Sequence, residues 1–293
     1  MTKKNRNLQI ILHCFFVLLS SAYILPFILM LSVSFSEEAS LVSSGFSLIP
    51  PVFSLDAYRL ALRNPAQLLQ SYKVTIIFTV ANTFLTLLVL SMLAYAISRP
   101  TFKFRRVIAF FAFFTMLFNG GLVPTYLLNV RYLRLDNTIW VYILPSLVSA
   151  WYLMILRTNF QQIPQALIES AKIDGAKEIY ICFKIVLPLS LPVLATIGFM
   201  NFVDKWNDWF TAVLYIRSPN LYSLQYLLQR ILREAEYLRQ LSSERAFLEA
   251  GADPPTESFR FAMALLASGP VLVIFPLFQK YFSKGMTVGA VKG

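Results

Sequence analysis

Very few side chains in this sequence are of the types that carry out acid–base, nucleophilic or metal chemistry. The single histidine, His13, lies beside Cys14 in a long apolar stretch, and the second cysteine, Cys182, is far from both in the sequence. A metal site needs several such ligands at close spacing, so we predict none. No glycine is followed by a lysine, so the glycine-rich loop that holds nucleotide phosphates is missing. These patterns predict a chain that is not an enzyme, needs no cofactor and does not hydrolyse ATP by that route.

One short polar segment has residue types and spacings that could bind another protein. Pro164 suits the first position of a helix, and that helix would run to about Ile173. Gly175 suits the end of the helix because glycine adopts a positive φ easily. Asp174 can act as the N-cap of a second short helix, Ala176–Ile185. The sequence therefore predicts two short helices joined by a tight turn.

Small residues surround this turn and would let it enter a groove on another protein. They are Ser170, Ala171, Gly175 and Ala176. The alternative is an ordinary helix–turn–helix cap at a membrane surface. The composition of the rest of the chain decides where this segment lies.

Long apolar stretches flank the polar segment. The chain has 293 residues, of which 57% are hydrophobic and 14% charged, and its mean hydropathy is +0.61. A soluble domain carries about 25% charged residues. Six windows of 19 to 30 residues contain no Asp, Glu, Lys or Arg: 7–36, 74–98, 107–130, 137–156, 185–203 and 261–279. Because a helix needs about 20 apolar residues to cross a bilayer, we predict an all-α integral membrane protein with six transmembrane helices.

The Lys and Arg residues are distributed unevenly between the segments that join these windows. With the amino terminus inside, the inner segments carry 14 of the 26 basic residues and three of the 15 acids. The outer segments then carry equal numbers of basic and acidic residues, so the net charge of +11 lies wholly on the inner side. Short cytoplasmic loops carry such an excess of Lys and Arg. We therefore predict cytoplasmic termini, contact of the basic loops with membrane lipid, and no binding of nucleic acid.

Three further features concern individual windows and loops. The window 7–36 has the basic flank of a secretory signal, but its length favours a retained first helix. The third window is interrupted at residues 119–121 and at Pro124, which predicts either a simple kink or part of a transport pathway. Residues 221–250 contain neither Gly nor Pro and have Leu and Ile at three- and four-residue spacing, which predicts an external amphipathic helix. That helix is either solvated or a docking surface for an external partner.

The polar segment also resembles a known family motif. The run Glu-Ser-Ala-Lys-Ile-Asp-Gly-Ala at residues 169–176, followed by Leu-Pro-Leu at 187–189 and by Pro192, resembles the EAA motif of ABC-importer permease subunits. Ser170 stands where alanine is usual. The spacing, the prolines and the position before the fifth window all agree with that motif.

Three other stretches extend the resemblance over nearly the whole chain. Residues 206–210, Trp-Asn-Asp-Trp-Phe, are similar to the W-N-E-F run of carbohydrate permeases, with Asp208 in place of Glu. Residues 289–293 resemble the G-A-V-K-G terminus of the maltose-permease G-like branch. Residues 119–126 resemble a subgroup that imports polysaccharide-derived oligosaccharides, including importers of uronate-rich chains such as alginate.

The resemblance implies a fold and a set of partners. The fold would be the type I ABC-importer (MetI-like) permease fold, a single transmembrane domain over residues 1–293. It would carry a cytoplasmic coupling segment at 158–186 and an external insert at 204–260. The partners would be a second homologous permease subunit, two ATPase subunits, an external solute-binding protein and an oligosaccharide substrate. The location would be the bacterial cytoplasmic (inner) membrane.

The resemblance also assigns roles to individual residues. The residues that would contact the ATPase or shape the turn that enters it are Glu169, Ser170, Ala171, Asp174, Gly175 and Ala176. The tail residues that would reach between the ATPases are Ala290 and Lys292. Aromatic faces and amides suit sugar rings and hydroxyl groups, and the candidates for the substrate pathway are Asn119, Tyr126, Tyr152, Asn201 and Trp206.

Two other classes of protein are alternatives. An ion-coupled secondary transporter or channel would place ionisable side chains inside its spans, whereas the six windows contain no formal charge. An integral membrane enzyme would need a catalytic constellation, and the sequence shows none. Both alternatives therefore fit the sequence less well than an importer subunit driven by another protein.

Overall fold

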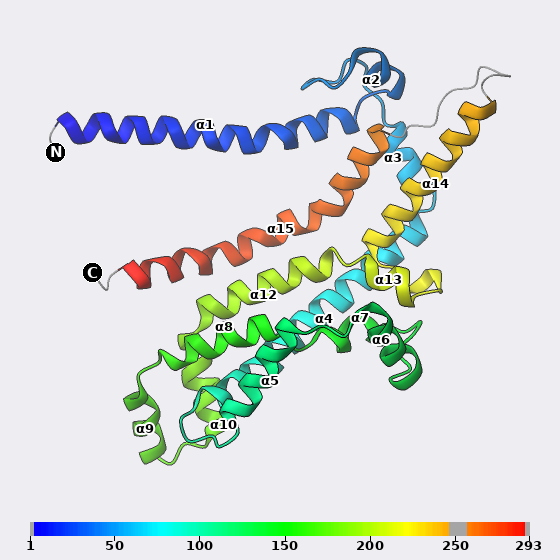
Figure 1. The fold of residues 1–293 in the computed structure, drawn as a ribbon. Coiled ribbons are helices and arrows are strands. Elements are labelled where there is room, and N and C mark those ends of the chain that lie inside the picture. Colours follow the sequence, from blue (N-terminus) through cyan, green and yellow to red (C-terminus); the bar gives the residue numbers. More distant parts are fainter. Residues whose placement is uncertain (1–2, 246–256, 291–293) are drawn as a thin grey trace. The chain divides into compact units, whose positions relative to one another are not determined.

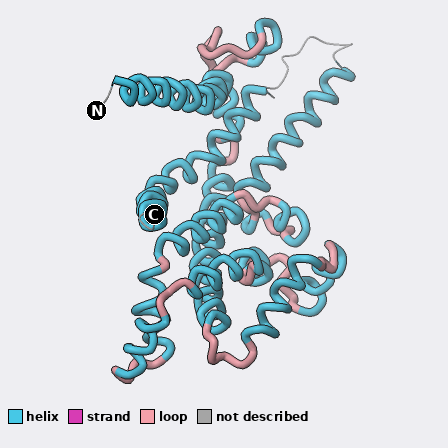
Figure 2. Tube along the Cα trace, turned by 60° about the vertical axis from the view of Figure 1, so that its left-hand side comes forward, coloured by secondary structure: helices cyan, strands magenta, loops and turns pink. Residues whose placement is uncertain are grey.

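The computed structural model describes residues 3–245 and 257–290, and the regular secondary structure of these residues is helical (Figure 1). Figure 2 shows the helices joined by loops and turns. Ser36 and Phe53 make an isolated antiparallel bridge. The elements in chain order are α1 (Lys3–Ser34), α2 (Glu38–Ser44), α3 (Asp56–Ala61), α4 (Pro65–Ser98), α5 (Arg105–Leu117), α6 (Leu122–Leu127), η1 (Leu128–Tyr132), α7 (Trp140–Ile143), η2 (Leu144–Ser146), α8 (Ala150–Gln161), α9 (Gln165–Ile173), α10 (Glu178–Ile181), η3 (Cys182–Val186), α11 (Leu187–Leu189), α12 (Leu191–Trp206), α13 (Phe210–Tyr215), η4 (Pro219–Leu221), α14 (Leu224–Arg245) and α15 (Glu257–Ala290).

The described helices include three that are long and apolar enough to cross a membrane. They are Gln9–Ser34 within α1, Pro65–Ser98 and Glu257–Pro276 within α15. Three helix pairs pass the same test jointly, but each is bent at a short break. These pairs are Arg105–Leu117 with Leu122–Tyr132, Trp140–Ser146 with Ala150–Gln161, and Glu178–Leu189 with Leu191–Trp206, bent by 119°, 50° and 83°. The described chain thus has three candidate spans, or six if each bent pair crosses once, and the six charge-free windows lie largely on these helices.

Each bend lies beside residues that weaken a helix. Gly121, with φ +91°, precedes α6, which confirms the predicted interruption of the third window. The second bend follows Pro145 in η2, and the third lies at Ser190, between Pro188 and Pro192. Proline lacks the backbone N–H that a helix interior needs. The prolines at the second and third bends therefore leave backbone carbonyl groups that can accept hydrogen bonds from other elements.

The two short helices predicted in the polar segment are present, but the second begins later than expected. Asp174 is the C-cap of α9, so its prediction as the N-cap of the next helix was wrong. Lys177 occupies the N-cap position of α10 instead. Its extended backbone, with φ −73° and ψ 153°, separates the left-handed Gly175 from the next helical residue. The helix predicted over Ala176–Ile185 therefore starts at Glu178 and continues through η3.

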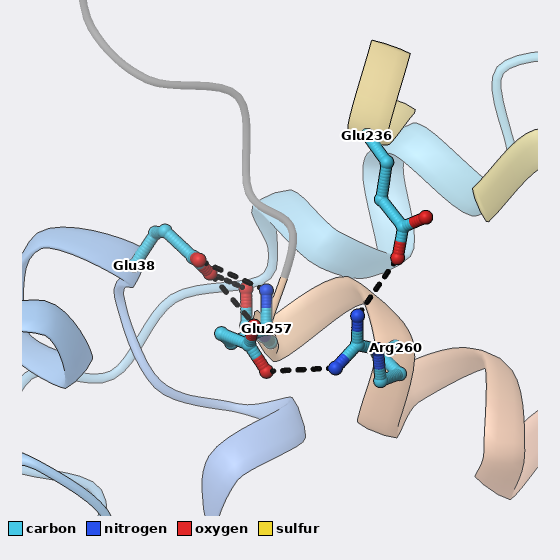
Figure 3. A network of polar contacts seen from close by, with 5 residues as sticks. Glu38, Glu236, Glu257 and Arg260 are labelled. Carbon is cyan, nitrogen blue, oxygen red and sulfur yellow. Dashed lines mark hydrogen bonds and ion pairs between the residues drawn. The ribbon is translucent and has the colours of Figure 1, made fainter. Parts of the chain in front are cut away.

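The described residues divide into two compact units, one within 1–68 and 227–269 and the other within 69–226 and 270–293. In the first unit, a carboxylate from α2 caps the start of α15 (Figure 3). Glu38 accepts hydrogen bonds from the Glu257 N–H at 2.9 Å and from the Ser258 N–H and hydroxyl at 3.0 and 2.8 Å. An anion is favourable at a helix N-terminus, so this contact fixes where α15 begins.

In the second unit, α4, α8 and α12 share a core with the polar segment. Buried members of this core include Leu90, Ile97, Leu153, Phe160, Ile168, Ile181 and Ile197. A Cβ at Gly198 would lie 3.1 Å from Leu87 Cδ1, so the glycine permits close packing of α12 on α4. Membrane helices associate through such close contacts and through hydrogen bonds, because lipid removes the hydrophobic driving force between them.

A buried asparagine in α4 connects three elements of this unit. Asn82 donates through Nδ2 to the Ile143 carbonyl at 2.9 Å and to the Ser146 hydroxyl at 2.9 Å, beside the break that follows η2. Its Oδ1 accepts a hydrogen bond of 2.9 Å from Asn201 in α12. Thr83 receives a second bond from the same Asn201 amide, at 3.2 Å. The network supplies partners for polar groups that the bend leaves inside the bundle.

Candidate coupling site and candidate pathway residues

The turn after α9 has the hydrogen bonds of a Schellman motif. The Gly175 N–H donates to the Lys172 carbonyl at 3.0 Å, and the Ala176 N–H donates to the Ala171 carbonyl at 2.9 Å. Gly175 has φ +82°, the left-handed conformation that this motif requires. Ala171 and Ala176 are half-buried and pack against the core of the second unit. The sequence predicted this glycine turn, and the structure gives its backbone geometry.

The outer side of this segment is exposed and carries apolar side chains. Ile173, at the end of α9, is 86% exposed, and Ile179 and Tyr180 in α10 are 69% and 57% exposed. Ile168, on the inner side of α9, is buried at 3%. Glu169 and Ser170 are exposed as well, and we call the three exposed apolar residues Ile173, Ile179 and Tyr180 the outer patch. Large apolar side chains are thus exposed at three positions within residues 173–180, a segment that also carries charged side chains.

One carboxylate joins the polar segment to α4. Glu178 Oε1 lies 2.6 Å from Lys172 Nζ, and its Oε2 accepts a hydrogen bond from the Tyr95 hydroxyl. Arg99 lies over the Tyr95 ring, 4.8 Å from its centroid. Neither Tyr95 nor Glu178 was among the site residues predicted from the sequence. Their separation by 83 positions leaves no local signal that they meet, although Glu178 lies within the resembling segment.

Of the five candidate pathway residues, Asn119 and Tyr126 lie around the break before α6. Asn119 is exposed, and its Oδ1 accepts a hydrogen bond of 2.9 Å from the Gly121 N–H. Tyr126 is half-buried and stacks on Tyr215, with ring centroids 5.5 Å apart. The Tyr215 hydroxyl lies 3.1 Å from Asn129 Nδ2, which donates to it. This region therefore presents an exposed amide at Asn119 and, seven residues further on, a tyrosine that stacks on Tyr215.

The other three candidates are buried in the second unit. Tyr152 donates through its hydroxyl to Asp204 Oδ2 at 2.8 Å. The amide of Asn201 is bonded to α4, and the side chain is 3% exposed. Trp206 is 1% exposed and stacks with Phe202 at 6.0 Å. Tyr152 on α8 therefore contacts α12, and Asn201 on α12 contacts α4. The five candidates do not form one common surface.

The Trp-Asn-Asp-Trp-Phe stretch forms a hydrogen-bonded corner after α12. Asp208 accepts from the Thr211 N–H at 3.0 Å and from the Thr211 hydroxyl at 2.7 Å, which holds the start of α13. The Asn207 side chain accepts from Gln225 at 3.2 Å, and the Ser223 hydroxyl donates to the Asp208 carbonyl at 2.9 Å. The corner therefore sets the direction in which the chain leaves α12 and enters α14. The Asp208 carboxylate therefore accepts hydrogen bonds that hold the local structure.

An open groove of about 510 Å³ runs beside α8. Trp151, Ile155 and Asn159 of α8 line it at four-residue spacing, which places them on one helix face, and Gln162, the C-cap of α8, lines it as well. Phe113 of α5 and Val193 of α12 form other parts of its wall. Of the two predicted tail residues, Ala290 is the last residue of α15, and Lys292 lies outside the described residues.

The fold and this segment agree with one family of membrane proteins. Residues 2–288 match the family described as the binding-protein-dependent transport system inner membrane component, and the chain belongs to that family. It is a permease subunit of an ABC transporter, so it is not catalytic, and a separate ATPase hydrolyses ATP. Other components of such transporters are a further permease, the ATPase and a solute-binding protein. The family resemblance inferred from the sequence is confirmed, and the secondary-transporter and enzyme alternatives are set aside.

Individual relatives match along almost the full chain. The chain is 39% identical over 290 residues to the polygalacturonan/rhamnogalacturonan transport system permease protein YtcP of Bacillus subtilis, covering 99% of this chain and 100% of the relative. It is 39% identical to protein LplC of the same organism over 270 residues, covering 92% and 90% of the two chains. A similar solved structure is a bacterial ABC transporter involved in the import of the acidic polysaccharide alginate, with a TM-score of 0.78 and 27% identity, covering 96% of this chain and 99% of the other.

Proposed function

We propose that this chain is one of two homologous permease subunits of a bacterial ATP-driven importer that moves uronate-bearing oligosaccharides across the cytoplasmic membrane. It crosses the membrane six times as one domain over residues 1–293, with both termini in the cytoplasm. Two features support this substrate class. The relative at 39% identity is named for polygalacturonan and rhamnogalacturonan, and the structural neighbour for alginate. All three polymers contain uronic acids.

The observation that carries the proposal is the exposed outer patch beside the Schellman turn. We place residues 158–186 at the cytoplasmic face, with α9 and the turn in a cleft of an ATPase subunit. Glu169, Ser170 and Asp174 then face that subunit, and Gly175 sets the angle of the turn. Ala171 and Ala176 hold the turn against the permease core. An apolar patch with a polar rim is the usual anatomy of a protein interface.

The remaining predicted site residues take part in two other contacts. The tail with Ala290 and Lys292 reaches between the two ATPase subunits. Asn119 and Tyr126 line the substrate pathway, where an amide and an aromatic ring can contact sugar hydroxyls and ring faces. An external solute-binding protein delivers the oligosaccharide to the outer side, where residues 204–260 form the largest external insert.

Three further candidates act from behind the pathway. Tyr152 and Asn201 link α12 to α8 and α4 through hydrogen bonds, and Trp206 is buried and stacks on Phe202 within α12. In this arrangement they shape the pathway without touching the substrate.

Reconstitution tests the function and the substrate class together. The chain is purified with its co-encoded permease, ATPase and binding protein and placed in liposomes. We expect oligogalacturonate or alginate oligosaccharides to stimulate ATP hydrolysis and to accumulate inside, and neutral oligosaccharides of equal length to have little effect. Stimulation by neutral oligosaccharides alone would contradict the uronate assignment. Transport by this chain without an ATPase would contradict the importer assignment.

Charge reversal at Glu169 tests the coupling contact. We expect Glu169→Lys to reduce uptake at least about tenfold, because a like charge placed at an interface costs several kcal/mol. Membrane insertion and abundance should not change, since Glu169 is exposed. Glu169→Gln, which keeps the shape and removes the charge, should lose less uptake. The measurements are uptake into vesicles and immunodetection in the membrane fraction, and full uptake by Glu169→Lys would contradict the contact.

A further inference from the structure

We propose that Glu178 is a positioning residue that ties the coupling helix α9 to α4, so that displacement of α9 by the ATPase moves α4. This inference rests on the proposed function, in which α9 contacts the ATPase. The Glu178 carboxylate is bonded to two residues of the permease itself, Lys172 and Tyr95. It therefore acts through other residues and not by contact with substrate or nucleotide.

The contacts of Glu178 involve both of its carboxylate oxygens. Oε1 pairs with Lys172 on α9 at 2.6 Å, and Oε2 accepts from the hydroxyl of Tyr95 on α4. Glu178 is the first residue of α10, so a single carboxylate bridges three helices. Hydrogen bonds to an ionised group are about twice as strong as neutral ones. A shift of α9 is therefore passed directly to the inner end of α4.

The receiving end of this bridge is held firmly. Tyr95 is 7% exposed, and the Arg99 guanidinium lies over its ring. Arg99 also donates to the Ser98 hydroxyl at 3.2 Å and to the Phe160 carbonyl at the end of α8, at 3.4 Å. The hydroxyl that meets Glu178 thus belongs to a packed residue, and a displacement of Glu178 is not absorbed by rotation of a loose side chain.

The exposure of the ion pair argues against a role in stability alone. The Lys172 and Glu178 side chains are 40% and 54% exposed. Pairs with this exposure contribute little to stability, because water screens them. Removal of the pair should therefore leave the fold intact. The main effect of the bridge is therefore that it joins α9 to α4.

The helix that receives the displacement also reaches the centre of the bundle. Tyr95 and Asn82 lie on the same uninterrupted helix α4, 13 residues apart, which corresponds to about 20 Å. Asn82 contacts the bent pair of helices at Ile143 and Ser146. A rigid helix is one means of carrying coupling between distant sites. Movement of α9 can in this way reach the break between η2 and α8.

The test uses the complete reconstituted transporter and measures the ratio of oligosaccharide taken up to ATP hydrolysed. We expect Glu178→Ala and Tyr95→Phe each to lower this ratio at least fivefold. Their double variant should fall no further, because both changes break the same bridge. Glu178→Gln should lower the ratio as well, because its single amide oxygen can accept from Tyr95 while its NH2 group cannot accept from Lys172 on α9. Glu234→Ala is the matched control, because Glu234 is 59% exposed and pairs with Arg230 within α14; its ratio should equal that of the wild type.

Several outcomes would overturn the inference. A wild-type ratio for Glu178→Ala would do so, as would a double variant that falls by the product of the two single effects. Loss of assembled complex in proportion to the loss of uptake would show a structural role instead. If the wild-type complex fails to respond to any oligosaccharide, the proposed function fails as well, which separates that result from a failure of Glu178 alone.

Discussion

A transporter with valine at position 175 should take up at least about tenfold less oligosaccharide than the wild type, although its permease inserts and accumulates normally. Gly175 has φ +82°, where a β-branched residue is strongly disfavoured. A Cβ at this position would have no atom within 4 Å, so the loss would come from the backbone and not from a clash. The turn would relax to a negative φ and lose the hydrogen bonds that close α9. The exposed end of α9 would then point in another direction.

Asparagine at position 175 provides the control for this change. Asparagine tolerates the left-handed conformation better than any β-branched residue, so Gly175→Asn should keep most of the uptake. Uptake into liposomes and co-purification with the ATPase measure the two effects. Equal uptake by the valine and asparagine variants would show that the conformation of Gly175 has no part in coupling.

Replacement of Asn82 by leucine should lower the stability of the permease by about 2 kcal/mol. Leucine is similar in size but removes one hydrogen bond each from the Ile143 carbonyl, the Ser146 hydroxyl and the Asn201 amide, of which the last keeps its bond to Thr83. A buried group that loses its partner costs about 1–3 kcal/mol, and hydrogen bonds between membrane helices are worth about 0.6 kcal/mol on average, with some near 2. Three affected groups therefore give a total near the stated value.

Thermal unfolding in detergent measures this change. For a chain of this size the midpoint should fall by roughly 5 °C. Thr86→Val is the control, because it removes one longer hydrogen bond to Asn82, of 3.3 Å, and leaves the other contacts in place. An unchanged midpoint for Asn82→Leu would show that the network does not hold the bent helices. Uptake by the variant should fall as well, since Asn82 lies between the coupling segment and the break after η2.

The positions of the helices could largely be predicted from sequence, because an absence of charge over about 20 residues is a direct consequence of the bilayer. The break at Gly121 and the turn at Gly175 were predicted for a similar reason, since glycine is needed where φ is positive. The bends after Pro145 and at Ser190 were not predicted. Proline is tolerated inside membrane helices when neighbours supply hydrogen bonds, so its presence alone does not define a bend.

The buried polar contacts were beyond prediction from the sequence. Asn82 lies in a charge-free window, and its partner Asn201 is 119 residues away. Asp174 was assigned to the wrong helix because a cap depends on the backbone conformation of the next residues, and Lys177 is extended. Three of the predicted pathway residues are buried. Aromatic and amide side chains serve equally well in packing and in sugar contacts, so their type alone did not show this burial. Composition does not distinguish these two uses.

The cap on the last helix has a consequence for how the protein is made. Glu38 and the Glu257 N–H that it accepts from are separated by 219 residues. A ribosome completes α2 long before it reaches the residues that this carboxylate holds. The contact between Glu38 and α15 can therefore form only after the residues that separate them have been translated.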